Sequence, residues 1–210
     1  MDLRMNQVPE QLQTDRLILT RLRHEDAEEI FYTYASKPES TRFVSWPTHQ
    51  WVKDTRAYLT RTITGWRQGI DFSYGIRLQA NGRLIGSCGF LNDGGKVQVG
   101  YVFGPLHWGK GYATEATREL IRVLNTQPGI FRIGSFVDAE NLASARVLIK
   151  AGFVEEAILQ NWFRFPNQGN VPKDCVLFKI PDLGKARFLD EQNFDIQGKL
   201  KNKILREQIW

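Results

Sequence analysis

The chain has 210 residues, of which 42% are hydrophobic, 12% aromatic and 24% charged, a composition typical of a globular protein. Its net charge is +5, but the basic residues are dispersed along the chain, which disfavours nucleic-acid binding. The sequence contains no apolar run of about 18 residues, so we expect no membrane span. The N-terminus does not resemble a secretory signal, and we therefore expect a cytoplasmic protein.

Hydrophobic periodicity and turn residues predict an antiparallel meander followed by a strand–helix–strand crossover. This order is typical of a mixed α/β fold. The turn Ala80-Asn81-Gly82 is a hairpin sequence. In chain order, the predicted elements are strand 17–22, helices 24–35 and 50–67, strands 72–79, 83–91 and 97–103, helix 111–126, strand 131–137, helix 141–150, and strands 153–159 and 175–180.

Residues 1–180 are expected to form one domain, because this length suits a single hydrophobic core. Residues 181–210 form a C-terminal appendage in this prediction. Leu200, Ile204 and Ile209 within it have the spacing of a short amphipathic helix, which could dock on the domain or on a partner. That spacing is compatible with a homodimer.

Cysteine and histidine spacing supports neither a disulfide framework nor a zinc site. Cys88 and Cys175 lie far apart and form no C-x-x-C motif. His24, His49 and His107 also lack the spacing of metal ligands. We therefore expect no metal, and we interpret Cys88 as a small buried residue.

A glycine-rich loop lies between the strand 97–103 and the helix that follows it. The loop contains Gly104, Gly109 and Gly111, which allow the backbone to approach a ligand closely. A helix N-terminus carries partial positive charge, so a phosphate or pyrophosphate fits there. A tight strand-to-helix turn without a ligand would use the same glycines. The loop is not an NTPase P-loop, because Gly111 stands where Ser or Thr should bind Mg²⁺.

The predicted helix 141–150 has two faces. One face carries Asn141, Ser144 and Leu148. The other face carries Leu142, Ala145 and Ile149 and suits the hydrophobic core. Asn141 is also a good helix cap, with Ser144 as a solvated residue. Both interpretations remain open at this point.

Together the two segments resemble the GNAT superfamily of acetyl-CoA-dependent N-acetyltransferases, and in particular its RimJ/RimL-type branch. The family's Q/R-x-x-G-x-G/A loop is similar to the segment from Trp108 to Ala113. Its N-x-x-S…K-x-G-F segment is similar to Asn141, Ser144, Lys150, Gly152 and Phe153. Further similarity lies in residues 14–22, 84–86 and 100–101, so the resemblance covers about residues 12 to 180.

The resemblance implies a GNAT fold, with a seven-stranded mixed sheet flanked by helices and splayed between its fourth strand (97–103) and fifth strand (131–137). It implies that acetyl-CoA is the co-substrate and that an amine is the acceptor. Ser144 and Tyr101 are the implied catalytic residues, Ser144 as the group that protonates the leaving thiolate. The implied cofactor-binding residues are Tyr101, Val102, Phe103, Trp108, Gly109, Lys110, Gly111, Tyr112, Ala113, Thr114, Asn141 and Ser144.

Two departures from the family pattern concern the proton-transfer groups. Gln98 stands where many relatives have Glu, and Leu148 stands where many have Tyr. A site without a strong base favours an α-amine as acceptor, because about 14% of such amines with a pKa near 7.8 are neutral at pH 7. Glu39 or Asp174 could act as a base through a water molecule, and the Trp46-Pro47 loop is the best candidate for an acceptor loop.

The prediction is therefore an N-acetyltransferase acting on a protein or peptide N-terminus or on a small α-amino compound. A GNAT module that binds acyl-CoA without catalysis, as a sensor or scaffold, is the alternative, since the two departures remove familiar catalytic groups. Several aromatic residues could shape the acceptor pocket, although such residues are also typical of a core: Tyr32, Tyr34, Phe43, Trp46, Trp51, Trp162 and Phe163.

Overall fold

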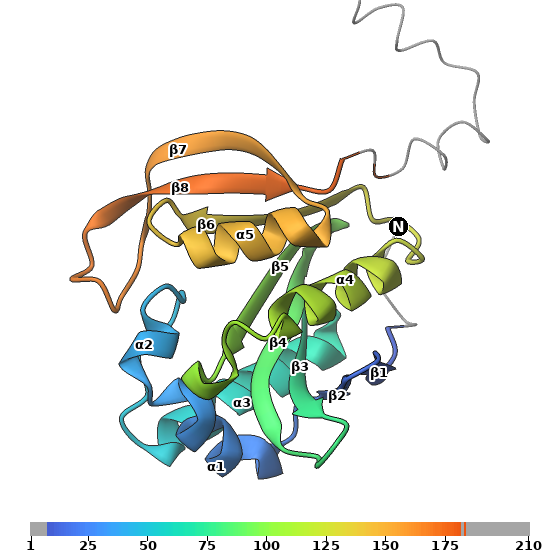
Figure 1. Cartoon of the computed structure of the whole chain (residues 1–210), viewed down its shortest axis with the longest axis vertical. Helices are drawn as coiled ribbons and strands as arrows, with labels where there is room; N and C mark the ends of the chain where they lie inside the picture. Colours follow the sequence, from blue (N-terminus) through green and yellow to red (C-terminus); the bar gives the residue numbers. More distant parts are fainter. Residues whose placement is uncertain (1–7, 182, 184–210) are drawn as a thin grey trace, which may run out of the picture.

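The computed structural model describes residues 8–181 and 183, which form a single mixed sheet with helices on both faces (Figure 1). The sheet has eight strands in the order β1-β2-β3-β4-β5-β6-β8-β7. All neighbouring strands are antiparallel except β5 and β6, which are parallel. The strands are β1 (Gln11–Gln13), β2 (Leu17–Arg21), β3 (Asp71–Leu78), β4 (Leu84–Asp93), β5 (Lys96–Phe103), β6 (Arg132–Asp138), β7 (Val154–Arg164) and β8 (Pro172–Lys179).

The mixed α/β GNAT-type architecture is as predicted, with one strand more than the seven expected. The additional strand is β1, which pairs Leu12 with Leu19 of β2. A three-residue segment shows too little alternation to be recognised from sequence. The fourth and fifth strands of the prediction are therefore β5 and β6.

The predicted helices are present with small changes at their ends. The segment 24–35 is divided into three short helical pieces, and α2 occupies part of the predicted loop, where Pro38 stands in its first turn. The helical elements are η1 (His24–Asp26), α1 (Ala27–Ile30), η2 (Phe31–Ala35), α2 (Pro38–Thr41), α3 (Val52–Gln68), η3 (Pro105–His107), α4 (Tyr112–Leu124) and α5 (Leu142–Ala151).

Two hydrophobic clusters lie on opposite faces of the sheet. Leu84 of β4 belongs to the cluster under α1 and α3, and the next residue, Ile85, belongs to the larger cluster under α4 and α5. Successive side chains of a strand point to opposite faces, so one strand contributes to both cores. Tyr34 is 1% exposed in the smaller cluster, where its hydroxyl lies 2.5 Å from Ser87 Oγ. It is therefore a core residue and does not line an acceptor pocket.

The sheet opens between β5 and β6. The two strands pair only at their beginnings, through Lys96 with Arg132, Val97 with Ile133 and Gln98 with Gly134. Beyond Gly134, β6 continues to pair with β8 on its other edge. The C-terminal halves of β5 and β6 therefore diverge, as predicted for the fourth and fifth strands.

The predicted C-terminal appendage and its amphipathic helix lie outside the described residues, apart from Pro181 and Leu183, of which Leu183 packs against the larger cluster. Within the part of the chain that the structure describes, no helix is both long and apolar enough to cross a lipid bilayer.

Candidate functional site

The diverging edge of β5 presents a few free backbone groups. Ser135 Oγ of β6 donates to the Val99 carbonyl at 2.9 Å, so Val99 faces β6. Because residues of a strand alternate between its two edges, Tyr101 faces the opening and Val102 faces β4. A Cβ placed on Gly86 of β4 would lie 2.4 Å from the Val102 oxygen, in agreement with this orientation.

Phe103 ends this edge, and its carbonyl is already engaged. Trp108 Nε1 donates to it at 2.9 Å and Ser40 Oγ of α2 donates to it at 3.0 Å. The Trp108 side chain therefore ties the glycine-rich loop to the end of β5. Of the three β5 residues predicted to bind the cofactor, Tyr101 therefore offers the most accessible backbone groups.

The N-terminus of α4 is open. Gly111 is its N-cap residue, with a left-handed backbone (φ 81°) and no side chain to accept from the first turn. The first intrahelical bond runs from the Glu115 amide to the Gly111 carbonyl, so the amides of Tyr112, Ala113 and Thr114 have no helical acceptor. The preceding loop residues Trp108, Gly109, Lys110 and Gly111 are exposed. These groups fit a pyrophosphate.

Thr14 and Arg16, near the beginning of the domain, bind Glu115 and the glycine-rich loop; we call this set of contacts the Arg16–Glu115 brace. Thr14 Oγ1 donates to Glu115 at 2.6 Å, and Arg16 Nε donates to the same carboxylate at 2.7 Å. Arg16 also donates to the Lys110 carbonyl at 3.1 Å and lies over the Tyr112 ring. Burial raises the pKa of Glu115, but the hydrogen bonds from Thr14 and Arg16 outweigh it, so the net pKa is lowered. Glu115 therefore remains a carboxylate at neutral pH.

The Arg16–Glu115 brace was not identified from the sequence. Thr14 and Arg16 were noted only as part of a segment similar to the family, and no pattern linked them to Glu115, about 100 residues later. The charge of Glu115 in the first turn of a helix is a weak indication on its own, because it is also explained by the helix dipole.

Tyr101 and Ser144 meet across the opening of the sheet. The Tyr101 hydroxyl lies 2.8 Å from Ser144 Oγ and donates to the Ser144 carbonyl at 3.1 Å. Asn141 Oδ1 accepts from the Ser144 amide at 3.1 Å, so Asn141 is the N-cap of α5. Burial raises the pKa of Tyr101, and its hydrogen bond with Ser144 offsets this only in part. The phenol is therefore neutral at pH 7 and carries a hydrogen-bond donor.

The inner face of α5 differs from the prediction. Leu148 is fully buried, whereas Leu142 and Ile149, predicted to face the core, are 59% and 52% exposed. The helix is therefore rotated so that Ala145 and Leu148 pack against the larger cluster. Ten residues allow several ways of choosing an apolar stripe, and only the position of β5 beneath the helix decides between them.

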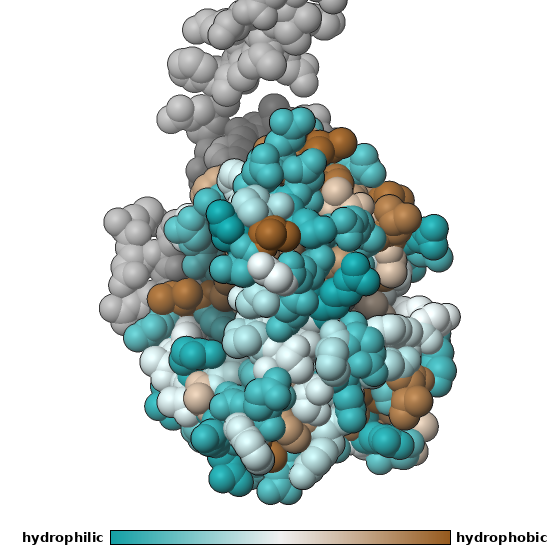
Figure 2. Space-filling view, turned by 90° about the vertical axis from the view of Figure 1, so that its left-hand side faces the viewer, coloured by the Kyte–Doolittle hydropathy of each residue, from teal (hydrophilic) through white to brown (hydrophobic). Residues whose placement is uncertain are grey.

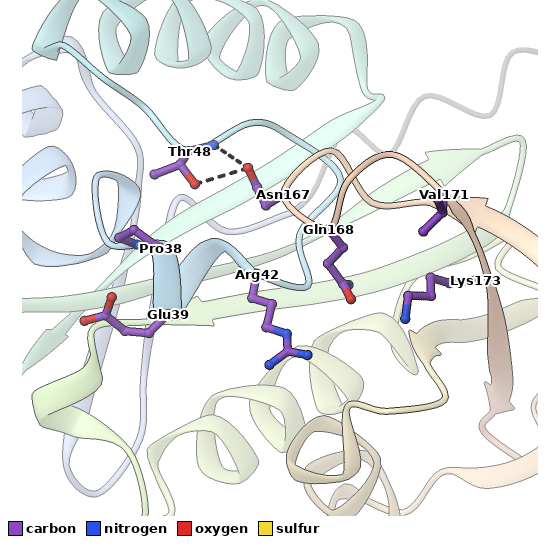
Figure 3. Close-up of a pocket in the computed structure, with 8 residues that line it drawn as sticks. All are labelled: Pro38, Glu39, Arg42, Thr48, Asn167, Gln168, Val171 and Lys173. Atoms are coloured by element: carbon purple, nitrogen blue, oxygen red, sulfur yellow. Dashed lines mark hydrogen bonds between the residues drawn. The ribbon is translucent and has the colours of Figure 1, made fainter.

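A polar cavity of about 660 Å³ lies where α2 faces the loop between β7 and β8 (Figure 3). Ser40 of α2 bonds to the end of β5, and Gln168 Nε2 of the loop donates to Asp138 at the end of β6, at 2.9 Å. The cavity therefore adjoins the mouth of the opening between β5 and β6. It is lined by Pro38, Glu39, Arg42, Thr48, Asn167, Gln168, Val171 and Lys173.

The Trp46-Pro47 loop borders this cavity. Asn167 Nδ2 donates to the Trp46 carbonyl at 2.8 Å, and Asn167 Oδ1 accepts from the Thr48 amide at 2.8 Å. Glu39 lines the cavity, whereas Asp174 lies on β8 and accepts from the Asn161 amide. Of the two bases considered from the sequence, only Glu39 is therefore at the cavity.

The other aromatic candidates do not line the cavity. Trp46 packs on His49 and Tyr58, and Phe163 packs between Phe136 and Phe165. Tyr32, Trp51 and Trp162 are exposed. Phe43 lies beneath the Arg42 guanidinium, 5.0 Å from it, and so contributes to the cavity indirectly.

Neither cysteine takes part in this arrangement. Both are free and buried, and burial raises the pKa of Cys88 well above its usual range and that of Cys175 to about 11. Among residues 8–181 and 183, no group of three or more His, Cys, Asp or Glu side chains is placed to hold a metal ion.

Comparison with known proteins identifies similar sequences and structures. The family described as "Acetyltransferase (GNAT) domain" matches residues 16–154. The uncharacterized N-acetyltransferase YoaA of Bacillus subtilis is 29% identical over 172 residues, which cover 80% of this chain and 95% of YoaA. The uncharacterized N-acetyltransferase p20 of Bacillus licheniformis is 31% identical over 156 residues, with 73% and 87% covered.

Two solved structures show the same fold. The microcin C7 self-immunity acetyltransferase MccE, in complex with acetyl-CoA and AMP, superposes with a TM-score of 0.74 at 19% identity, with 82% of this chain and 96% of MccE covered. RimL, the ribosomal L7/L12 α-N-protein acetyltransferase, in complex with coenzyme A, superposes with a TM-score of 0.71 at 16% identity, with 82% and 96% covered.

Proposed function

The chain belongs to the GNAT acetyltransferase family and is an acetyl-CoA-dependent N-acetyltransferase, and from this premise we propose that its acceptor is an α-amine. The acceptor is the free N-terminus of a protein or peptide, or a small α-amino compound. The observation that carries this proposal is the hydroxyl pair of Tyr101 and Ser144 at the opening of the sheet, near a cavity whose lining contains one carboxylate, that of the exposed Glu39.

The binding groups for acetyl-CoA support the premise. Acetyl-CoA supplies the thioester whose acetyl group is transferred. The open amides of Tyr112, Ala113 and Thr114 hold the pyrophosphate, together with the exposed loop from Trp108 to Gly111. The Tyr101 backbone edge orients the pantetheine between β5 and β6, in line with Ser144. Asn141 fixes the first turn of α5 as its N-cap.

The hydroxyl pair supplies protons but does not remove them. Tyr101 is neutral because burial raises its pKa. Its hydroxyl lies 2.8 Å from Ser144 Oγ, so Tyr101 can pass its proton to Ser144 when Ser144 protonates the leaving thiolate. Neither group is a base at neutral pH. The amine must therefore arrive largely deprotonated, or lose its proton through water to Glu39.

The ionisation of amines then discriminates between acceptors. An α-amine with a pKa of about 7.8 is roughly 14% neutral at pH 7, whereas a lysine side chain with a pKa of about 10.4 is neutral in roughly one molecule in 2,500. The difference in neutral fraction corresponds to about 3.5 kcal/mol in favour of the α-amine.

The test uses two peptides of identical sequence containing one lysine. One has a free N-terminus and an acetylated lysine side chain, and the other has an acetylated N-terminus and a free lysine. We expect CoA release at pH 7 with the first peptide at a kcat/KM at least about 100-fold higher, as the neutral fractions require. For the first peptide kcat/KM should rise tenfold per pH unit below about pH 7 and level off above about pH 8.

Mass spectrometry of the product locates the acetyl group and provides the control. Equal rates on both peptides at pH 7 would contradict the α-amine proposal, because a strong base would then be acting on the amine. A pH profile that is flat between pH 6 and 8 for the free N-terminus would contradict it as well.

A further inference from the structure

We propose that Arg42 is an anion-binding residue for the acceptor, and that the preferred acceptor carries a carboxylate close to its amine. This carboxylate belongs either to an acidic side chain following a peptide N-terminus or to a small amino acid. The inference rests on the proposed function, since it names the acceptor class of the same cavity.

Arg42 has few partners of its own. Its guanidinium contacts Glu140 at 3.5 Å, a distance longer than a good charged hydrogen bond, and packs over the Phe43 ring. Among the residues that the structure describes, none forms a hydrogen bond with this guanidinium. Its side chain is 56% exposed and lines the cavity. The planar fork of five N–H donors is therefore available to a ligand.

Other arginines of the domain show what a structural role looks like. Arg77 is held by Asp26 at 2.8 Å and by Glu29 at 2.7 Å. Arg122 binds Glu119 through two hydrogen bonds of 2.8 and 2.7 Å. In both cases carboxylates bind the guanidinium N–H groups at hydrogen-bond distance. Arg42 differs from them in having a single long contact.

Glu140, the only residue that forms an ion pair with Arg42 among those the structure describes, interacts mainly with Lys173. Lys173 Nζ donates to Glu140 at 2.7 Å. The hydrogen bond from Lys173 is the main cause that lowers the pKa of Glu140, and the positive charge of Arg42 contributes less. Glu140 thus forms a close ion pair with Lys173 and only a long contact with Arg42. Glu39 lies on α2, just before Arg42 in the chain, but in Figure 3 its side chain points away from that of Arg42.

The position of Arg42 fits an acceptor rather than the cofactor. Arg42 belongs to the segment that follows α2, and Figure 3 shows its side chain extending in the same direction as that of Gln168 on the facing loop. Gln168 is tied to Asp138 at the end of β6, where the sheet is open. The groups proposed to bind the pyrophosphate lie at the N-terminus of α4, and none of them lines the cavity.

The surroundings of the cavity also favour a polar, charged acceptor. Figure 2 views the molecule from the side of α2 and the β7–β8 loop, and this face is mainly hydrophilic, with only separate hydrophobic patches. Thr48 and Asn167 contribute further polar groups to the lining. The Arg42 guanidinium lies over the Phe43 ring at 5.0 Å, and an arginine that packs on a ring in this way can still bind a carboxylate through its N–H edge.

The experiment compares two peptides with free N-termini that differ only in having Glu or Gln as the second residue. For the unaltered protein we expect the acidic peptide to have a kcat/KM about tenfold higher, as one charged hydrogen-bonded pair provides. In Arg42→Gln this ratio should fall to about one, and in Arg42→Lys to an intermediate value, because the charge remains while the fork is lost.

Arg56→Gln is the matched control. Arg56 is an equally exposed arginine on α3, with one long contact of 3.9 Å to Glu28, and it does not line the cavity. The ratio in this variant should remain about tenfold. Calorimetric titration of the two peptides into the protein without acetyl-CoA gives a second readout, in which the acidic peptide should bind more tightly and Arg42→Gln should remove the difference.

Free glutamate, glutamine and a simple amine without a carboxylate distinguish the two sources of the anion. Acetylation of both amino acids but not of the amine assigns the α-carboxylate of a small substrate, and preference only among the peptides assigns an acidic side chain. Equal ratios in the unaltered protein and in Arg42→Gln would overturn the inference. Acetylation of lysine side chains alone would instead overturn the α-amine proposal.

Discussion

The N-termini of α4 and α5 are built in opposite ways. At α4 the cap residue is Gly111, which has no side chain, and the first-turn amides have no acceptor in the helix. At α5 the cap residue is Asn141, whose side chain accepts from the Ser144 amide. Both helix starts carry the same partial positive charge, but only that of α4 is left open to an anionic ligand.

The difference shows how one fold divides two tasks between two similar helix ends. The open end of α4, supported by the Arg16–Glu115 ion pair, offers free backbone amides to the anion that we propose binds there. The closed end of α5 is rigid and places the Ser144 hydroxyl against Tyr101. Gly111 leaves the first-turn amides of α4 accessible to a ligand, and Asn141 occupies a first-turn amide of α5. The following variants test this division, from the largest expected effect to the smallest.

Gly111→Asp should abolish binding at the open helix end. The new carboxylate would lie beside the first-turn amides, where Arg16 Nη2, 3.5 Å from the position of a Cβ, would hold it. Competition and repulsion should weaken acetyl-CoA binding on the order of 100-fold or more, measured by calorimetry. Gly94→Asp is the control, because Gly94 has a similar positive φ of 58° in the β4–β5 turn and open space around it. Unchanged affinity in Gly111→Asp would refute the pyrophosphate assignment.

Tyr101→Phe should act on the reaction at the closed helix end and leave the cofactor affinity nearly unchanged. Loss of the hydroxyl partner of Ser144 should lower kcat on the order of 10- to 100-fold, within the range of acid–base contributions. Tyr74→Phe is the control, since its buried hydroxyl also has a hydrogen bond, to the Pro9 carbonyl at 2.8 Å, away from the opening. A similar fall of kcat in both variants would indicate a general loss of structure instead.

Asn141→Ala should reduce the stability of the domain by about 1 kcal/mol, because the Ser144 amide loses its cap. Thermal unfolding measures this change, and Asn141→Ser should restore most of the stability, since serine is also a good cap. The comparison between the helix ends also requires that acetyl-CoA binds Asn141→Ser nearly as well as the unaltered protein. A large loss of affinity in that variant would show direct contact of the amide side chain with the cofactor.

Glu115→Gln should have the smallest effect, and it should depend on pH. The pKa of Glu115 is lowered in the folded chain, so its stabilisation is present above the pKa of the unfolded chain, about 4.3, and is lost as the pH falls through the folded value. At pH 7 we expect a loss of less than about 1 kcal/mol, since the brace is partly exposed. The stability difference from the unaltered protein should disappear toward pH 3. A difference that is the same at both pH values would exclude the charge as its cause.

Much of the fold could be predicted from local sequence. The meander, the glycine-rich loop, the helix end at Gly152 and the divergence of the fourth and fifth strands follow from period, turn residues and the two family segments. The predictions failed where the signal was short or ambiguous. Gln11–Gln13 is too short to show alternation, and the apolar residues of α5 allow two different inner faces, of which the structure buries the one with Leu148.

The sequence by itself determined the glycine-rich loop and the uncapped start of α4, because the glycines that a backbone site for phosphate needs stand at fixed spacing on one continuous segment. The acceptor end was decided only by the tertiary structure. Its groups come from α2 and the segment that follows it, from the β7–β8 loop and from β8, and Arg42 and Lys173 stand 131 positions apart along the chain. Side chains so distant in sequence have no spacing to recognise, and their charges combine only when the sheet brings them to one cavity.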